Sequence, residues 1–349
     1  MAQPRDSFWR LERKNRRQTA LLVVVFISLF TALGCGLDFL AGNLKVIDGR
    51  LAGAPILTVV ALAFGLFQAL LSYYGGASLV LLSVHARPLE ADSVKHQVTL
   101  DVIREMALAA RMPAPRAYLI DDPAPNAFAT GRDPAHSVIC MTQGLVDRMD
   151  REELQGVIGH EMAHIRDYDI RTMMMIAVLV GGVAMLADFV WRWSWFGGFG
   201  DRDFRGRGGR DNSGGDGGEA GALIAIAVLI LAAVAPIFSQ LLAMAVSRQR
   251  EYLADAASVE FTRNPKALLR ALEEIAKSES PLRAASRGVA HLFIVNPLES
   301  AAEGDGGGEN FFANLLSSHP PLAQRIARLR ALAAEGSMPG STAAAPATH

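Results

Sequence analysis

The segment His160-Glu161-Met162-Ala163-His164 places two histidines and a glutamate at a spacing that can support metal chemistry. Residues four apart on a helix share a face, so both imidazoles can reach one ion. Glu161 projects toward the open side of that ion, where it can hold and deprotonate a bound water. Because neutral imidazole suits Zn²⁺ and catalytic zinc sites keep a position for water, the spacing predicts one catalytic zinc ion per chain.

The residues around this motif predict the amphipathic helix that the spacing needs. Asp150 is a candidate N-cap, and Glu153 follows it at the distance of a capping box. HExxH is short enough to arise by chance in a charged helix, so the zinc interpretation depends on this context. The apolar residues that one face of the helix can bury are Leu154, Val157, Ile158 and Ile165.

A third ligand must come from elsewhere, because the extended motif HExxHxxGxxH is absent. The segment Ser247–Glu260 supplies Glu251 as the candidate, with Asp255 four residues later on the same helix face. Asp255 is then placed to accept the second N–H of a zinc-bound histidine and to fix its tautomer. The alternative is a solvated helix in which these two acids pair with Arg248 or Arg250.

Apolar blocks dominate the rest of the chain, which has 349 residues, 51% of them hydrophobic. The blocks cover residues 19–42, about 51–72, 170–190 and 221–246, and each is about as long as a bilayer-spanning helix requires. We therefore expect an α+β, predominantly helical integral membrane protein. It has four transmembrane helices and a zincin-like cytoplasmic catalytic domain, built from segments on both sides of the second hairpin.

Shorter patterns predict individual elements in the soluble stretch after the second apolar block. Helical spacing predicts a helix over 92–110, and turn signals bound predicted strands at 116–120 and 138–141. Residues 75–85 form either an interfacial connector or a continuation of the second span.

The composition divides the chain into six predicted parts. They are a basic N-terminus (1–18), a first transmembrane hairpin with connector (19–86), a first catalytic segment (87–169), a second hairpin with a Gly/Asp/Arg-rich loop at 196–219 (170–246), a second catalytic segment (247–332) and a disordered tail (333–349).

Basic residues predict the orientation in the membrane. A cluster of them ends the N-terminal segment, and the positive-inside rule then places the N-terminus and both catalytic segments in the cytoplasm. Arginines in the loop 196–219 oppose this assignment. A cleavable signal peptide is the alternative for the first block, but the apolar run is too long and lacks a clear cleavage site. The opposing arginines are Arg202, Arg205, Arg207 and Arg210.

Other classes of function find less support. A net charge of −1 gives no electrostatic basis for binding nucleic acid, and we expect none. Cys35 and Cys140 are far apart and form no CxxC pair, which argues against a thiolate zinc site. A transporter needs ionisable groups or broken helices within its spans, and only Asp38, Gln68 and Pro236 fit that description. A catalytically silent membrane scaffold is the other alternative.

Four motifs in one order resemble the HtpX-type membrane metalloproteases, gluzincins related to the CAAX prenyl proteases. They are APNAFATG at 124–131, HEMAH at 160–164, SRQREYLAD at 247–255 and SHPPLAQR at 318–325. The resemblance covers roughly residues 10–332. It implies that His160, His164 and Glu251 bind the zinc ion and that Glu161 is the general base.

The same resemblance implies a substrate site and additional polar groups near the zinc. The segment Asn126, Ala127, Phe128 and Ala129 would form a strand edge to which an extended substrate adds. His319 and Arg325 would lie near the zinc as stabilisers of the oxyanion. Read alone, His319 followed by two prolines is a helix-start signal.

The expected function is that of a zinc metalloendopeptidase in the bacterial inner membrane. A helix rise of about 1.5 Å per residue puts the site about 10 Å from the bilayer, which suits membrane proteins as substrates. The resemblance implies quality control of membrane or misfolded proteins under stress. A processing protease for lipidated C-termini is the alternative with the same chemistry. The expected partners are these protein substrates and the lipid bilayer, and the sequence predicts no oligomeric state.

Overall fold

A computed structural model describes residues 4–40, 42–47, 49–179, 248–278, 282, 289–295 and 320–335. The described residues divide into two compact units. One contains 4–15, 77–174 and the described residues from 248 onward, and the other contains 16–76 and 175–179. Several predicted parts lie outside the described residues: most of the second hairpin, the loop 196–219, His319 and residues 336–349 of the tail. Residues 333–335, predicted as the start of a disordered tail, are helical instead.

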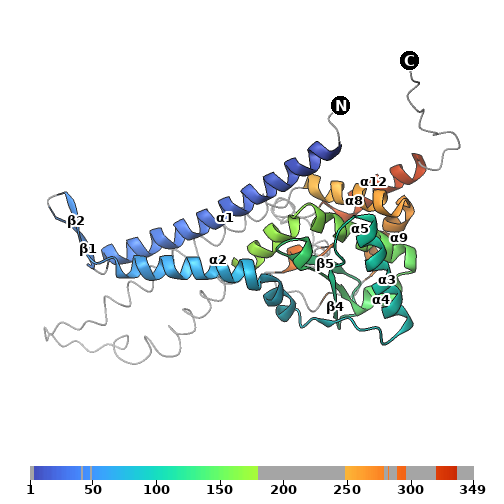
Figure 1. Cartoon of the computed structure of the whole chain (residues 1–349), viewed down its shortest axis with the longest axis horizontal. Coiled ribbons are helices and arrows are strands. Elements are labelled where there is room, and N and C mark those ends of the chain that lie inside the picture. Colours follow the sequence, from blue (N-terminus) through green and yellow to red (C-terminus); the bar gives the residue numbers. More distant parts are fainter. Residues whose placement is uncertain are drawn as a thin grey trace, which may run out of the picture. The chain divides into compact units, whose positions relative to one another are not determined.

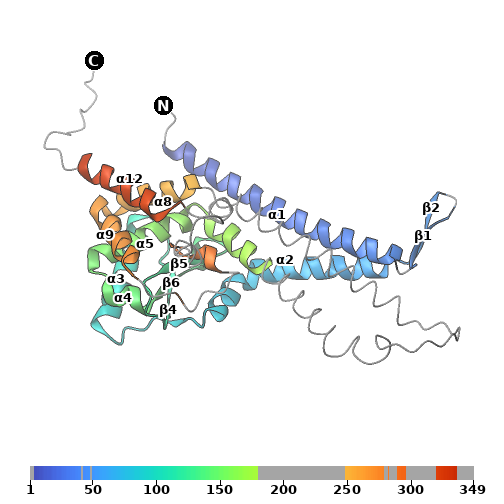
Figure 2. The same ribbon diagram turned by 180° about the vertical axis from the view of Figure 1, so that it is seen from behind.

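Two long apolar helices form most of the second unit. Helix α1 (Pro4–Leu40) and helix α2 (Ile56–Ser83) run side by side (Figures 1 and 2). Among the described residues they contain two candidate membrane spans, Asn15–Phe39 with a mean hydropathy of 2.5 and Ile56–Ser83 with 2.0. A Cβ at Gly34 would lie 2.6 Å from the Leu57 carbonyl oxygen, so the helices approach too closely there for a side chain.

The structure corrects the sequence boundaries of these helices. The helix of the first span begins before the apolar block, because α1 is helical from Pro4 onward. The second helix begins at Ile56 rather than at residue 51, because strands β1 (Leu44–Ile47) and β2 (Arg50–Gly53) form an antiparallel hairpin before it. Helix α2 also includes most of residues 75–85, so this stretch continues the helix.

Asp38 has a structural role in this unit. Its carboxylate accepts hydrogen bonds from the backbone N–H groups of Leu57 (3.0 Å) and Thr58 (2.8 Å) and from the Asn43 amide (2.9 Å). These N–H groups belong to the first turn of α2, which has no partners for them within the helix. Asp38 therefore caps α2, and it is not the mid-span charge that a transporter would need.

The first unit contains a four-stranded sheet with β5 at one edge. Its strands are β3 (Arg87–Pro88), β4 (Arg116–Ile120), β5 (Ala127–Gly131) and β6 (Ser137–Thr142), in the order β3-β4-β6-β5. Strands β4 and β6 are parallel, and the other pairs are antiparallel. The two strands predicted from the sequence are confirmed as β4 and β6.

The helices of this unit gather around α5 (Arg151–Arg166), as Figure 2 shows. The predicted capping box is confirmed: the Asp150 carboxylate accepts from the Glu153 N–H at 2.8 Å, and the Glu153 carboxylate accepts from the Asp150 N–H at 2.9 Å. The other helices are α3 (Val94–Ala109), α4 (Gln143–Arg148), helical residues 169–174, α8 (Arg248–Thr262), α9 (Pro265–Ala276) and α12 (Leu322–Glu335), with 3-10 turns at Pro134–His136 (η1) and Ala290–Leu292 (η3).

Small residues let α5 pack directly against α8 and α9. A Cβ at Gly156 would lie 2.4 Å from the backbone nitrogen of Leu268 in α9. The Ser258 hydroxyl of α8 donates to the Gly156 carbonyl oxygen at 2.6 Å. The apolar face of α5 is also buried, with Val157 and Met162 fully covered. This close packing fixes the position of α8 relative to the histidines of α5.

Candidate metal centre

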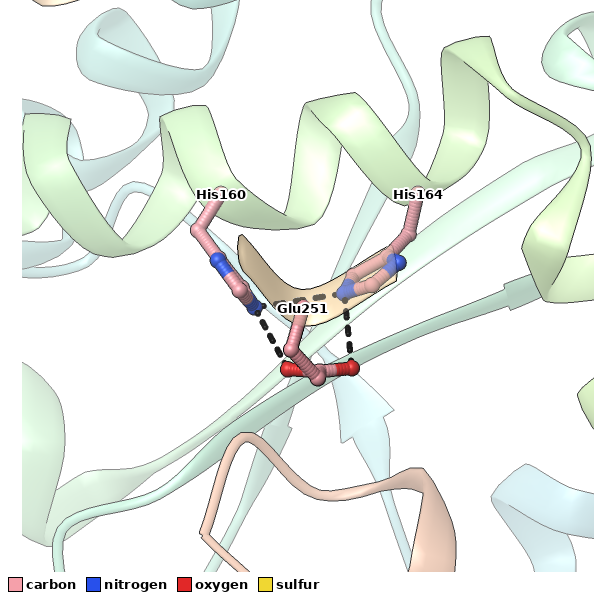
Figure 3. Close-up of side chains that lie close together, drawn as sticks. All are labelled: His160, His164 and Glu251. Carbon is pink, nitrogen blue, oxygen red and sulfur yellow. Dashed lines mark hydrogen bonds and ion pairs between the residues drawn. The ribbon is translucent and has the colours of Figure 1, made fainter. Parts of the chain in front are cut away.

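His160, His164 and Glu251 converge on one point between α5 and α8, as Figure 3 shows. The two histidine Nε2 atoms lie 3.2 Å apart. His160 Nε2 is 3.5 Å from Glu251 Oε2, and His164 Nε2 is 3.5 Å from Glu251 Oε1. All three side chains are buried. The structure thus brings together the three residues that the sequence predicts as metal ligands.

The geometry of this group fits a tetrahedral metal ion such as zinc. Zinc bound to nitrogen and oxygen at about 2.05 Å holds neighbouring ligand atoms about 3.3 Å apart. The separation of 3.2 Å between the two Nε2 atoms matches that spacing, and each Nε2 atom lies 3.5 Å from one of the two Glu251 carboxylate oxygens. Two imidazole nitrogens and a carboxylate are also a donor set typical of catalytic zinc.

Each imidazole has a carboxylate behind it. His160 Nδ1 lies 3.0 Å from Asp255 Oδ1, and His164 Nδ1 lies 3.2 Å from Asp169 Oδ2. An Nδ1–H that donates to a carboxylate leaves the Nε2 lone pair directed at the ion and makes it a better ligand. Asp255 is the carboxylate that the sequence predicts behind a zinc-bound histidine. Asp169 was not predicted, although it lies only five residues after His164, and that proximity is the signal that could have indicated it.

Arg325 from α12 completes the environment of His160. Its guanidinium donates to Asp255 through two bonds, Nε to Oδ2 at 3.1 Å and Nη2 to Oδ1 at 2.7 Å. It also donates to the Ile294 carbonyl oxygen at 2.9 Å, and Nη1 lies 3.6 Å from Glu251 Oε2. Arg325 is 1% exposed. The resemblance placed it near the zinc, and the structure shows it bound to the carboxylate that faces His160.

The charges of these groups shift one another's pKa values. Burial and the Arg325 guanidinium lower the pKa of His160, but its contacts with Asp255 and Glu251 outweigh them and raise it to about 9. Burial raises the pKa of Asp255, but Arg325 and His160 outweigh it and lower the value to about 2. Asp255 therefore remains a charged acceptor throughout the physiological range.

Glu161 faces a small cavity beside the two histidines. Burial raises the pKa of its carboxyl group, while the backbone N–H of Ala129 and the nearby histidines oppose that shift. A carboxylate with a raised pKa is a stronger base. The cavity has room for about one water molecule. Its lining is Ala129, His160, Glu161, His164, Ile170, Met173, Leu292 and Ile294.

The predicted substrate segment forms the outer edge of the sheet, in β5. Part of that edge already has partners from residues 290–295. The Ile294 N–H donates to the Ala127 carbonyl oxygen at 2.8 Å, and the Asn126 amide donates to the Val295 carbonyl oxygen at 2.8 Å. Phe293 packs edge-on against Phe128, with ring centroids 4.9 Å apart.

Two expectations about neighbouring residues need correction. Arg250 donates to Asp169 at 3.1 Å, and Asp255 pairs with Arg325, so the solvated helix proposed as the alternative for α8 is wrong. The continuous helix on which the distance to the bilayer was based is also wrong. Helix α5 ends at Arg166, and Tyr168 adopts a left-handed conformation with φ of 61°, so no single helix continues from His164 into the next apolar block.

Comparison with known proteins identifies the family. A model of peptidase family M48 matches residues 94–333, so the chain belongs to this family. Proteins named "Protease HtpX homolog" are similar over nearly their whole length. The protein of Lactobacillus helveticus is 37% identical over 90% of this chain and 97% of its own length. The protein of Levilactobacillus brevis is 40% identical over 90% of this chain and 96% of its own length. The protein of Caldanaerobacter subterraneus is 38% identical over 93% of this chain and 98% of its own length.

A solved structure, that of S. mikatae Ste24p, aligns with 92% of this chain at 19% sequence identity and a TM-score of 0.44. This chain spans 66% of the length of that protein. The M48 match and the HtpX relatives make the chain a membrane metalloprotease, with two candidate spans among the described residues. The buried group of His160, His164 and Glu251 can hold its metal ion.

Proposed function

We propose that this protein is a zinc metalloendopeptidase whose ion is held by His160, His164 and Glu251. The observation that carries the proposal is the convergence of these three donor groups, with both histidines lining the same cavity as Glu161. When bound, zinc supplies a Lewis acid that polarises the scissile carbonyl and lowers the pKa of a bound water. Every other chemical role falls to side chains of the chain itself.

Glu161 acts as the general base in this proposal. It takes a proton from the attacking water and later delivers that proton to the leaving amine. Its buried position and raised pKa support both transfers. Asp255 and Asp169 hold the two imidazoles in the tautomer that a metal ion requires, and Arg325 holds Asp255 in place. His319 remains the proposed oxyanion donor, by resemblance to the family.

The proposed substrate is an extended polypeptide that adds to the outer edge of β5. Such a strand would use the backbone groups of Ala127 and the side-chain amide of Asn126. Residues 290–295 make these contacts in the structure, so they must move aside for a substrate to bind. Unfolded segments have free backbone groups to offer, which favours misfolded proteins and exposed loops of membrane proteins as substrates.

For the membrane arrangement we propose four spans with the catalytic parts on the cytoplasmic side of the bacterial inner membrane. The two candidate spans and the basic residues before the first one support this orientation. The proposal includes a role in protein quality control, which rests on the resemblance to the HtpX-type proteases alone.

The test is metal dependence of cleavage. The full chain is purified in detergent with a chelator, zinc is added back, and cleavage of casein is followed. The proposal predicts that cleavage is lost with the chelator and returns at one zinc per chain. Cleavage that continues in the chelated protein, or zinc binding without cleavage, would contradict it.

A further inference from the structure

Asp169 connects the candidate metal ligand His164 to two other parts of the chain. One carboxylate oxygen, Oδ2, lies 3.2 Å from His164 Nδ1. The other, Oδ1, accepts from Arg250 at 3.1 Å and from the Asn15 amide at 2.6 Å. Asp169 is 4% exposed, so this arrangement is shielded from water. The orientation of His164 therefore depends on groups that hold Asp169.

Asn15 is the group that reaches Asp169 from the N-terminal helix. It is the first residue of the candidate span Asn15–Phe39 in α1, and it is 2% exposed. Its Nδ2 donates both to Asp169 Oδ1 at 2.6 Å and to the Asp167 backbone carbonyl at 2.8 Å. Both amide hydrogens are thus directed at one short turn, 154 residues away in the sequence.

That turn needs external support. It separates α5 from helical residues 169–179, and Tyr168 at its centre has a φ of 61°. A non-glycine residue in the left-handed region costs free energy and persists only where its surroundings fix it. Asn15 bonds to the residues on both sides of Tyr168. It therefore fixes the backbone that determines where the Asp169 carboxylate lies.

The two histidines have matching supports. Behind His160, Asp255 is held by the Arg325 guanidinium. Behind His164, Asp169 is held by Arg250 and Asn15. The second arrangement includes the neutral amide of Asn15, which adds one hydrogen bond to the buried Asp169 carboxylate without adding a charge.

We propose that Asn15 is a positioning residue for the metal centre, acting through Asp169 on His164. The inference rests on the proposed function, since it takes His164 as a metal ligand. It assigns the start of the first candidate span a role in metal binding in addition to anchoring. Removing a carboxylate that orients a metal-bound histidine weakens metal binding by roughly 10- to 100-fold. Asn15 contacts the carboxylate and not the histidine, so its removal should weaken zinc binding by about 10-fold, the lower end of that range.

The experiment compares zinc affinity in full-length proteins purified in detergent, by competition with a chromophoric chelator. Asn15→Leu removes both N–H donors at similar size, and Asn15→Asp removes them and adds a like charge. Gln18→Leu is the matched control, because it removes an amide three residues along the same helix. We expect Asn15→Leu to weaken zinc binding roughly 10-fold, Asn15→Asp to weaken it further, and Gln18→Leu to leave it unchanged.

A double-variant cycle tests the route through Asp169. If Asn15 acts through that carboxylate, Asn15→Leu should weaken zinc binding by less than about twofold in an Asp169→Asn background. If Asn15→Leu weakened zinc binding as much in the Asp169→Asn background as in the unaltered chain, the route through Asp169 would be overturned. Unchanged zinc affinity in whichever Asn15 variant folds would overturn the proposal.

These outcomes are distinct from failure of the proposed function. Zinc binding by the unaltered chain without casein cleavage would contradict the peptidase and leave the Asn15 measurement valid. Absence of zinc binding by the unaltered chain would overturn both.

Discussion

Asp255 and Arg325, 70 residues apart in the sequence, form a buried ion pair with two hydrogen bonds directly behind His160. The pair links α8, which carries Glu251, to α12, and both residues are at most 3% exposed. A buried pair of this kind adds little net stability compared with apolar side chains, but breaking it leaves an uncompensated charge. Its position indicates that it serves the metal centre.

Replacing Arg325 with Met should therefore destabilise the protein by about 3–5 kcal/mol and weaken zinc binding. The Asp255 carboxylate would lose its partner and no longer hold His160. In the double variant Arg325→Met with Asp255→Leu, stability should largely return because both charges are gone, while zinc affinity should not. Unfolding by denaturant and chelator competition measure the two effects.

The control for this prediction is Arg104→Met, which breaks the exposed pair with Asp101. Exposed pairs contribute about 0–1 kcal/mol, so little change is expected. If the double variant recovered full zinc affinity, the role of Asp255 behind His160 would be refuted.

Gly156→Ala should separate α5 from α9. The added Cβ would lie 2.4 Å from the backbone nitrogen of Leu268, and backbone atoms cannot move aside as a flexible side chain can. Overpacking of this kind costs about 1–3 kcal/mol or more. We expect a lower midpoint of thermal unfolding together with weaker zinc binding, because α5 carries both histidines.

Gly36→Ala in α1 is the comparison for that variant. A Cβ there meets nothing within 4 Å among the described residues. It should be neutral or stabilising by up to about 1 kcal/mol, from helix propensity alone. Equal destabilisation by Gly156→Ala and Gly36→Ala would show that the close approach of α5 and α9 at Gly156 does not explain the loss of stability.

Substrate binding should release residues 290–295 from the edge of β5. In zinc-loaded Glu161→Gln protein, which should hold substrate without cleaving it, amide hydrogen exchange in this segment should be slow. Adding unfolded casein should raise it, because a substrate strand would take the bonds that Ile294 and Val295 make. Exchange in β6 serves as the internal reference and should stay slow. Continued protection of 290–295 with casein bound would show that this segment is a fixed part of the sheet.

Local patterns of sequence predicted the elements that carry the chemistry. The capping box at Asp150 and the apolar spacing of α5 placed the HExxH histidines on one helix face, where the structure has them. Turn signals bounded β4 and β6. The third member of the metal group, Glu251, followed from residue type and from the resemblance, and the structure places it 3.5 Å from both histidines.

What local patterns could not supply was pairing over long distances. The bonds of Asn15 with Asp169 and of Arg325 with Asp255 join residues 154 and 70 positions apart, and neither pair has a periodic signal. Strand β5 is buried along its whole length, so it lacks the alternation of polar and apolar residues that marks a half-exposed strand. The hairpin of β1 and β2 lies between the first two apolar blocks, where the sequence pattern predicted no strands.

The central claim is that Glu161 is the base of a zinc peptidase whose ligands do not include it. Glu161→Gln keeps the size of the side chain and removes its basicity. In one preparation, zinc content and the rate of casein cleavage should be measured for the unaltered chain and for this variant. We predict one zinc ion per chain in both and a fall in cleavage of roughly 10²- to 10⁴-fold in the variant. Cleavage near the rate of the unaltered chain would contradict the role of Glu161, and loss of zinc from the variant would contradict the separation of base from ligands.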